Sequence, residues 1–245
     1  MTALPLRAIF FDAGNTLLYP CVEELAADLT AQGYAATAED FYAAERIGKQ
    51  KLDEWLWPQI RQGALPRTID HYYWGEYLRA LVERTGVREA ERLRIIERVA
   101  ERFRDITLWS VVLPETPPFL MKLCAQGYFL GVISNSIGTM EEQLERVGLV
   151  RHFDTVLDSA IVGVEKPHPE IFQMALSRVP PCGLQPAEAL FVGDTNATDM
   201  GGAQLAGLRG VLIDRVGAYP HATCPRITLL PELGGILENL NTLPS

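Results

Sequence analysis

Three aspartates have positions in which they could form a charged reaction centre. Asp12 directly follows the short apolar run Ala8–Phe11, and Asp194 follows the run Ala189–Val192 and one glycine. Asp199 lies one helical turn beyond Asp194. Carboxylates that converge on one crevice repel each other, so they require cations nearby. A hard divalent ion that prefers oxygen ligands, such as Mg²⁺, is a natural partner for such a set.

A lysine and two polar side chains complete the candidate set. Ser134 and Asn135 follow another apolar run, and Lys166 lies between Glu165 and Pro167. A carboxylate next to a metal ion and a lysine can attack phosphorus in line and form an aspartyl-phosphate. The ion and Lys166 would spread the charge on the transferring group, and Ser134 could donate to its oxygens. These residue types therefore favour phosphoryl transfer to Asp12.

Short apolar runs that alternate with helical segments must position these residues. The runs are too short for typical helices and are suited to strands that are buried on both faces. Strands that alternate with helices form parallel sheets, and such sheets bind ligands at the carboxyl ends of their strands. The sequence therefore predicts an α/β fold with a Rossmann-like parallel sheet flanked by helices. The expected strands are residues 8–11, 129–133, 155–157, 189–192 and 210–213.

The segment after the first strand interrupts this alternation. Residues 21–104 have the apolar spacing of about four helices, with no strand among them. We therefore predict a discontinuous α/β core of residues 1–18 and 110–245 and a four-helix-bundle-like cap of residues 19–109. Because the cap is inserted at the carboxyl end of the first strand, we expect it to cover the ligand crevice.

The prolines and the apolar spacing of this helical segment predict two further details. A loop is expected from Pro58 to Pro66, because two prolines bound a polar stretch. The last helix of the segment is expected to bury one stripe at helical spacing. That stripe consists of Leu93, Ile96, Ala100 and Phe103.

Composition restricts the possible partners. The chain of 245 residues has a net charge of -9, which disfavours general nucleic-acid binding through phosphate neutralisation. Hydrophobic residues make up 48% of the sequence, yet no stretch approaches the length of a membrane span. The four cysteines are scattered without metal-ligand spacing, which is typical of a reducing compartment. We expect a cytoplasmic protein that acts on a small molecule, and the sequence gives no oligomeric state.

The chain resembles the haloacid dehalogenase-like hydrolase superfamily, in the branch with a helical cap after the first motif. Four motifs carry the resemblance, in order: Asp12–Thr16, Val132–Asn135, Val164–Phe172 and Gly193–Asp199. The resemblance implies that Asp12 is the nucleophile and a metal ligand, that Ser134 binds the phosphoryl group, and that Lys166 stabilises charge. It implies further that Asp194 and the backbone carbonyl of Gly14 are ligands of Mg²⁺. Asp199 would complete the metal site.

One position departs from the pattern of the phosphatases in this superfamily. They carry a second aspartate two residues after the nucleophile, where this chain has Gly14, and a glycine where this chain has Asn15. The missing aspartate would protonate the leaving group and later activate water. General acid–base help of this kind is worth roughly 10²–10⁴-fold in rate. Efficient cleavage of an alkyl phosphate would therefore require another proton donor.

Several functions remain compatible with this departure. The first is Mg²⁺-dependent phosphoryl transfer, either from good leaving groups such as acyl or aryl phosphates or with a proton donor from the cap. Four cap residues could supply such a donor, although each is more simply interpreted as part of a solvated helix face. They are Glu45, Arg46, Lys49 and Lys51.

The other candidates use the same residues differently. Dehalogenases of the superfamily also lack the second aspartate and carry an asparagine that Asn196 matches. However, they have a serine at the position of Asp194 and a tyrosine at that of Phe172. A third candidate is a binding or regulatory protein with little turnover. A minor fourth is a phosphonate hydrolase in which Lys49 or Lys51 would form a Schiff base.

Overall fold

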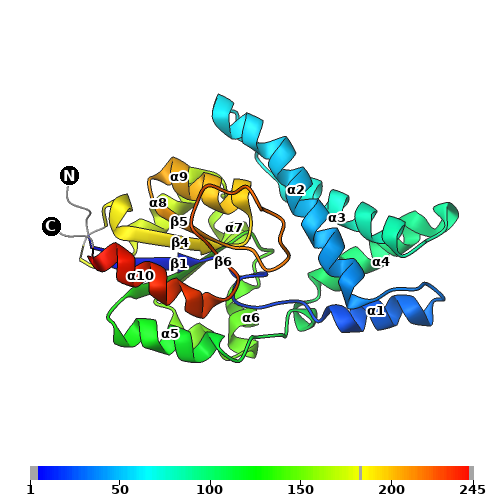
Figure 1. The fold of residues 1–245 in the computed structure, drawn as a ribbon, viewed down its shortest axis with the longest axis horizontal. Coiled ribbons are helices and arrows are strands. Elements are labelled where there is room, and N and C mark those ends of the chain that lie inside the picture. Colours follow the sequence, from blue (N-terminus) through cyan, green and yellow to red (C-terminus); the bar gives the residue numbers. More distant parts are fainter. Residues whose placement is uncertain (1–4, 182–183, 243–245) are drawn as a thin grey trace.

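The centre of the fold is a parallel sheet of six strands. The computed structural model describes residues 5–181 and 184–242 (Figure 1). The strand order is β3-β2-β1-β4-β5-β6. This order makes the first strand central, as expected for a strand that carries a ligand-binding residue. The strands are β1 (Ala8–Phe11), β2 (Phe129–Ser134), β3 (Thr155–Asp158), β4 (Ala189–Gly193), β5 (Arg209–Ile213) and β6 (Arg226–Ile227). The five expected strands are confirmed, and β6 is an addition.

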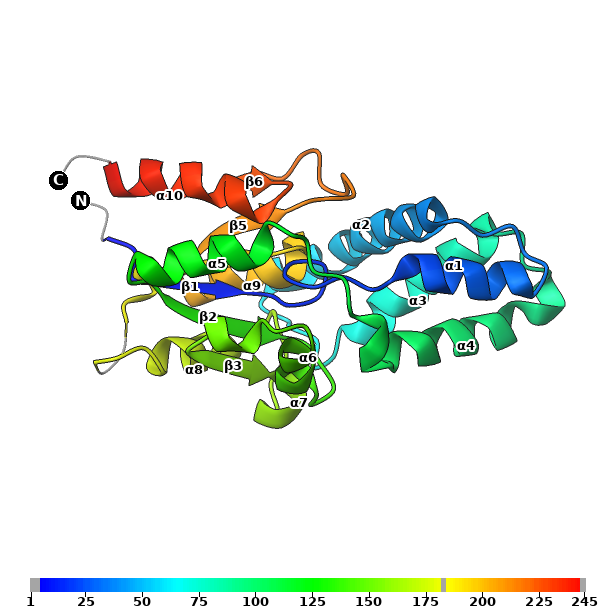
Figure 2. The same cartoon turned by 90° about the horizontal axis from the view of Figure 1, so that it is seen from below.

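Alternate residues of β1 belong to two separate cores. Ile9 and Phe11 pack with the apolar faces of α5 (Thr116–Ala125) and α10 (Leu233–Thr242). Ala8 and Phe10 pack with α8 (Pro169–Ser177) and α9 (Gly201–Ala206) on the other face (Figure 2). A strand buried on both faces must be apolar throughout, which explains the uninterrupted run before Asp12. Two shorter helices, α6 (Met140–Arg146) and α7 (Ser159–Val162), complete this part.

The register of the central strands brings their carboxyl ends to one level. Phe11 lies opposite Val132 of β2 and Val192 of β4. Asp12 is therefore next to the end of β2 on one side and the end of β4 on the other. The backbone of Asp12 also donates a hydrogen bond of 2.8 Å to the carbonyl oxygen of Val192. This register is what assembles the candidate site.

A block of four helices lies beyond the carboxyl ends of the strands (Figure 1). It contains α1 (Val22–Ala31), α2 (Ala38–Gln62), α3 (Asp70–Arg84) and α4 (Arg92–Arg104). These helices have a hydrophobic core of their own, centred on Phe41, Tyr77 and Leu81. None of the helices in the described ranges combines the length and apolarity that crossing a bilayer requires.

Two expectations for this block were wrong. The predicted loop from Pro58 is helical as far as Gln62, because burial of Leu56 and Ile60 outweighs the loss of one backbone donor. Leu93 was expected in the core but is 77% exposed, whereas Ile95, Val99 and Phe103 are buried. Ile96 and Ala100 of the expected stripe are partly buried against the same core, so the buried face of the helix is turned away from Leu93.

Candidate active site

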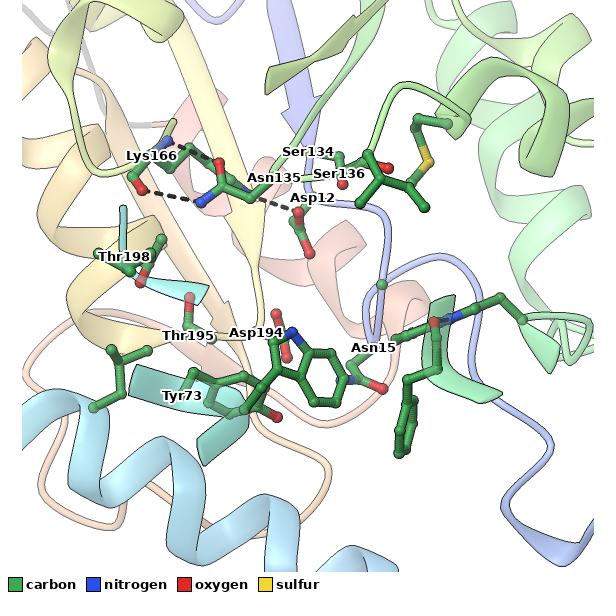
Figure 3. Close-up of a pocket in the computed structure, with 18 of the residues that line it drawn as sticks. Asp12, Asn15, Tyr73, Ser134, Asn135, Ser136, Lys166, Asp194, Thr195 and Thr198 are labelled. Carbon is green, nitrogen blue, oxygen red and sulfur yellow. Dashed lines mark hydrogen bonds and ion pairs between the residues drawn. The ribbon is translucent and has the colours of Figure 1, made fainter. Parts of the chain in front are cut away.

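Three carboxylates meet at the carboxyl end of the sheet. Asp12 follows β1, Asp194 follows β4, and Asp199 lies in a π-helical turn, Asn196–Met200. One oxygen atom of each lies within 4.8 Å of the others, and all three residues are buried. Figure 3 shows Asp12 and Asp194 directed into the same space. The convergence expected from the sequence is therefore present.

Lys166 neutralises two of these carboxylates. Its Nζ lies 2.6 Å from Oδ1 of Asp12 and 2.7 Å from Oδ1 of Asp199. Only 2% of the residue is exposed. Burial opposes the charge on this lysine, but the two carboxylates outweigh burial and raise its pKa above the ordinary value. Lys166 therefore remains an ammonium ion.

Asn135 holds the backbone of Lys166. Its side-chain amide donates to the carbonyl oxygen of Lys166 at 3.0 Å and accepts from the backbone N–H of Lys166 at 2.8 Å. Figure 3 shows these bonds. Asn135 also lines the cavity above Asp12, as does Ser134, which is buried at the end of β2. Since both functions of the Asn135 amide are used for Lys166, this residue fixes the lysine.

Both carboxylate oxygens of Asp199 already accept hydrogen bonds within the protein. Oδ1 accepts from Lys166, and Oδ2 accepts from the backbone N–H of Thr195 at 2.9 Å and from its hydroxyl at 2.7 Å. Among the described residues, no group donates a hydrogen bond to Oδ2 of Asp12 or to Oδ1 of Asp194. These two oxygens are therefore the ones that could accept an additional cation, with Asp199 as a supporting anion.

A lysine of the helical block reaches the site. Nζ of Lys49, on α2, lies 2.8 Å from Oδ2 of Asp194 and 2.6 Å from Oε1 of Glu45. Only 1% of Lys49 is exposed, so its assignment to a solvated helix face was wrong. Its spacing was a usable signal, because Lys49 precedes the buried Leu52 by three residues. By contrast, Lys51 pairs with Glu54 on the surface, as expected for a solvated face.

The helix α2 also binds the loop after β4. The carboxylate of Asp53 accepts from the backbone N–H of Ala197 at 2.9 Å and from the side chain of Asn196 at 2.7 Å. The Asn196 side chain therefore bonds to the helical block. A few residues earlier, Arg46 donates to the carbonyl oxygen of Val216 at 2.6 Å. One face of α2 is thus fixed to the sheet end that carries Asp194.

The turn after Asp12 contains one residue, Asn15, in the left-handed backbone conformation. Asn15 has a φ of 54°, and its backbone N–H bonds to the carbonyl oxygen of Leu18 at 2.9 Å. Asparagine tolerates this conformation better than other residues with a Cβ atom. The exchange of the family's glycine for Asn15 is therefore compatible with the same turn.

One organising residue was missed from the sequence. Asp158 is the last residue of β3, and its carboxylate accepts from the backbone N–H groups of Gly138, Met140 and Ala160 at 3.0–3.1 Å. It fixes the loop that brings Ile137 and Met140 to the cavity. Its position directly after an apolar run, like that of Asp12, was the signal that could have identified it.

The carboxylates are held in a state that favours an additional cation. Burial raises the pKa of Asp12 to about 7, because the effect of Lys166 is outweighed by burial and by the other two aspartates. Burial likewise raises the pKa of Asp194 to about 6, against the opposing effect of Lys49. Oδ2 of Asp12 and Oδ1 of Asp194 are buried carboxylate oxygens whose charge is not fully offset by the lysines. Such oxygens are the ligands that a hard divalent cation prefers.

These shifts predict how stability of the metal-free protein depends on pH. The pKa of Asp12 is higher in the folded protein than its ordinary value of 3.8, so folding favours the neutral carboxyl. The stability that this neutral carboxyl contributes is fully present below pH 3.8 and is lost as the pH rises through about 7. The stability of Asp12→Asn relative to the unmodified protein should therefore be higher at pH 8 than at pH 5.5, by about 1–2 kcal/mol, which corresponds to a few degrees in melting temperature.

Thermal unfolding in EDTA at the two pH values measures this difference. Glu54→Gln, at a surface position, serves as the control and should show no such pH dependence. An equal gain for Asp12→Asn at both pH values would contradict the expected ionisation of Asp12.

Comparisons with known proteins agree with this geometry. A family model described as haloacid dehalogenase-like hydrolase matches residues 6–207. A phosphoserine phosphatase from Thermus thermophilus is 35% identical over 216 residues, which cover 85% of this chain and 82% of that protein. The (S)-2-haloacid dehalogenase 4A of Burkholderia cepacia is 30% identical over 224 residues, or 88% of this chain and 86% of that protein. A solved structure of a HAD phosphatase from Thermococcus onnurineus has a TM-score of 0.57 at 25% identity, covering 95% of this chain and 98% of that one.

Proposed function

The chain belongs to the haloacid dehalogenase-like hydrolase family and is a hydrolase; within this family we propose that it is a Mg²⁺-dependent phosphatase of small phosphorylated compounds, with Asp12 as nucleophile. The observation that carries the proposal is the buried cluster of Asp12, Asp194 and Asp199 with Lys166. The similarity to a phosphoserine phosphatase over most of the chain supports the same reaction class.

The donor set fits Mg²⁺. Oδ2 of Asp12, Oδ1 of Asp194 and the backbone carbonyl of Gly14 would hold it, and Asp199 would add negative charge without giving up its hydrogen bonds. When bound, the ion would offset the charge of the carboxylates and of the phosphoryl group. Carboxylate and carbonyl oxygens are the ligand types that this ion prefers.

The residues of the chain then have distinct tasks. An oxygen of Asp12 attacks phosphorus, and the bond from phosphorus to the leaving-group oxygen breaks with its electron pair. The resulting aspartyl-phosphate is hydrolysed by water, which restores the carboxylate and releases orthophosphate. Lys166 offsets negative charge on Asp12 during both steps, since it lies 2.6 Å from Oδ1. Ser134, which lines the cavity, would bind a phosphoryl oxygen, and Asn135 would keep Lys166 in position through its two hydrogen bonds to the backbone of that lysine.

The helical block would act as a cap. We assign residues 19–109 to this cap and residues 1–18 and 110–245 to the core, because α2 bonds to the loop after β4 and the four helices share a separate hydrophobic cluster. The cavity lies between the two and suits a small molecule rather than a polymer. Cys21, Cys124 and Cys224 are free thiols, which is compatible with a cytoplasmic location.

Dehalogenation is the second candidate, supported by the similarity to the Burkholderia enzyme. In that reaction Asp12 would attack carbon and release halide without a metal ion. The geometry supports it less well, because Asp194 adds a buried negative charge within 4.8 Å of the nucleophile. The side chain of Asn196, which matches the dehalogenase asparagine, is bonded to Asp53 of α2.

A paired assay separates the two candidates. Phosphate release from acetyl phosphate and from an aryl phosphate is measured with Mg²⁺ and with EDTA, and halide release from 2-chloropropionate is measured in parallel. We expect phosphate release that falls by at least about 10²-fold in EDTA, because the charge of the buried carboxylates is then uncompensated. Metal-independent halide release without phosphatase activity would overturn the proposal in favour of dehalogenation.

A further inference from the structure

The space beside Gly14 is filled by the indole of Trp109. A Cβ atom at Gly14 would lie 3.1 Å from Cζ3 and 3.4 Å from Cη2 of this ring. The ring is fixed, because its Nε1 donates a hydrogen bond of 2.9 Å to the carbonyl oxygen of Phe103. An acidic side chain at position 14 would therefore have to displace Trp109 or shift the turn after Asp12. The absence of a side chain at Gly14 thus leaves the space that the indole occupies.

The same indole forms part of the wall of the cavity above Asp12. This cavity has a volume of about 380 Å³, with the aspartates and Lys166 among its lining residues. Polar residues such as Asn15, Gln143 and Thr198 also line it, together with apolar side chains that come from both the helical block and the loops of the sheet. The apolar ones include Leu78, Ala100, Phe103, Trp109, Ile137 and Met140.

Carboxyl groups in the lining of this cavity are confined, within the described ranges, to the three aspartates of the candidate site, Asp12, Asp194 and Asp199. Lys49 contacts Asp194 but is not among the lining residues. His71 and Arg104 do line the cavity, and both are exposed. Tyr73 also lines it, as does Lys166, whose ammonium group is bonded to Asp12 and Asp199. A leaving group beside Gly14 would thus contact the indole of Trp109 where the phosphatases of the superfamily carry a carboxylic acid.

We propose that this cavity is a leaving-group subsite for small aryl phosphate monoesters. The inference rests on the phosphatase function proposed above and deepens it. A flat ring would lie against Trp109 and the neighbouring apolar side chains, where aromatic contacts favour binding. When Asp12 forms its bond to phosphorus, the bond from phosphorus to the aryl oxygen breaks and the electron pair goes to that oxygen. The group departs as a phenolate, which is stable enough to leave without prior protonation.

A leaving-group series with the unmodified protein and Mg²⁺ tests this proposal. The substrates are phenyl phosphates with substituents that vary the acidity of the phenol, together with phosphoserine and glyceraldehyde 3-phosphate. We expect kcat/KM for the aryl compounds to exceed that for the alkyl compounds by at least about 10²-fold and to rise steeply with phenol acidity, since position 14 carries no carboxylic acid to assist departure. If alkyl phosphates are hydrolysed as fast as aryl phosphates, the inference is wrong and the proposed function stands. If no compound releases phosphate, both are wrong.

Two variants test the role of the indole itself. Trp109→Ala should lower kcat/KM for phenyl phosphate at least about 10-fold, mainly through KM, and affect acetyl phosphate much less, because acetyl phosphate has a good leaving group but no ring. Trp109→Phe should retain most activity on phenyl phosphate, and Met121→Ala, at an exposed position of α5, is the control. Equal losses on both substrates would show that Trp109 only supports the fold and would overturn the subsite.

Discussion

Lys166→Met is expected to abolish turnover and to destabilise the protein strongly. The substitution keeps approximately the length of the side chain but removes the ammonium group that contacts Asp12 and Asp199. The three aspartates then remain close together without that positive charge. Removing one partner of a buried ion pair typically costs about 3–5 kcal/mol, because the other charge remains buried and unpaired. In a chain of this size that corresponds to a fall in melting temperature of roughly 10 °C. The kcat for phosphate release should fall at least about 10³-fold, since charge on the phosphoryl group is no longer offset.

A double variant separates the two losses. Asp199→Asn added to Lys166→Met removes one of the uncompensated charges, and an amide can still accept the hydrogen bonds from Thr195. The melting temperature should recover in part, whereas kcat should remain low, because the lysine beside Asp12 is still absent. Recovery of activity together with stability would mean that Lys166 only maintains the fold. Lys51→Met, on the surface of α2, controls for the loss of a lysine as such.

The sequence predicted the parts of the site that depend on strand ends. An apolar run of four residues followed by an aspartate could be read directly as β1 and Asp12, because a doubly buried strand tolerates no polar residue. Parallel neighbours end at the same edge, so Asp194 and Ser134 could be placed next to Asp12 without knowledge of the register. Lys166 could be proposed from the need to offset the charge of these carboxylates, and the resemblance to a family with four ordered motifs supported the same residue.

Interactions between the helical block and the sheet were less predictable. Glu45 and Lys49 are four residues apart on a helix, a spacing typical of a solvated ion pair. The spacing from Lys49 to Leu52 indicates the buried face of α2, but only the position of α2 against the end of β4 shows that Lys49 contacts Asp194. The sequence showed that Gly14 replaces an aspartate, but it did not show what occupies the vacated space. Trp109 lies 95 residues further along, and its contact with Gly14 depends on the path of the chain out of α4.

Lys49→Met is expected to increase the affinity for Mg²⁺. Nζ of Lys49 lies 2.8 Å from Oδ2 of Asp194 and thereby offsets the charge of one proposed metal ligand. A divalent ion held by Asp12 and Asp194 would have to share Asp194 with this ammonium or displace it, and like charges a few ångströms apart repel by several kcal/mol even at an effective dielectric constant of about 20. Removing the ammonium should therefore lower the Kd for Mg²⁺ at least about 10-fold, measured by calorimetry on the protein without substrate.

The same variant should make the metal-free protein less stable, because Glu45 and Asp194 lose their shared cation. Mg²⁺ should then raise the melting temperature of Lys49→Met more than that of the unmodified protein, since the ion supplies the missing positive charge. Lys51→Met again serves as control, with an unchanged Kd. Weaker Mg²⁺ binding in Lys49→Met would show the opposite arrangement, in which Lys49 holds Asp194 in the orientation that the ion requires. Measured together, the Kd and the melting temperature distinguish a lysine that competes with the metal from one that positions its ligand.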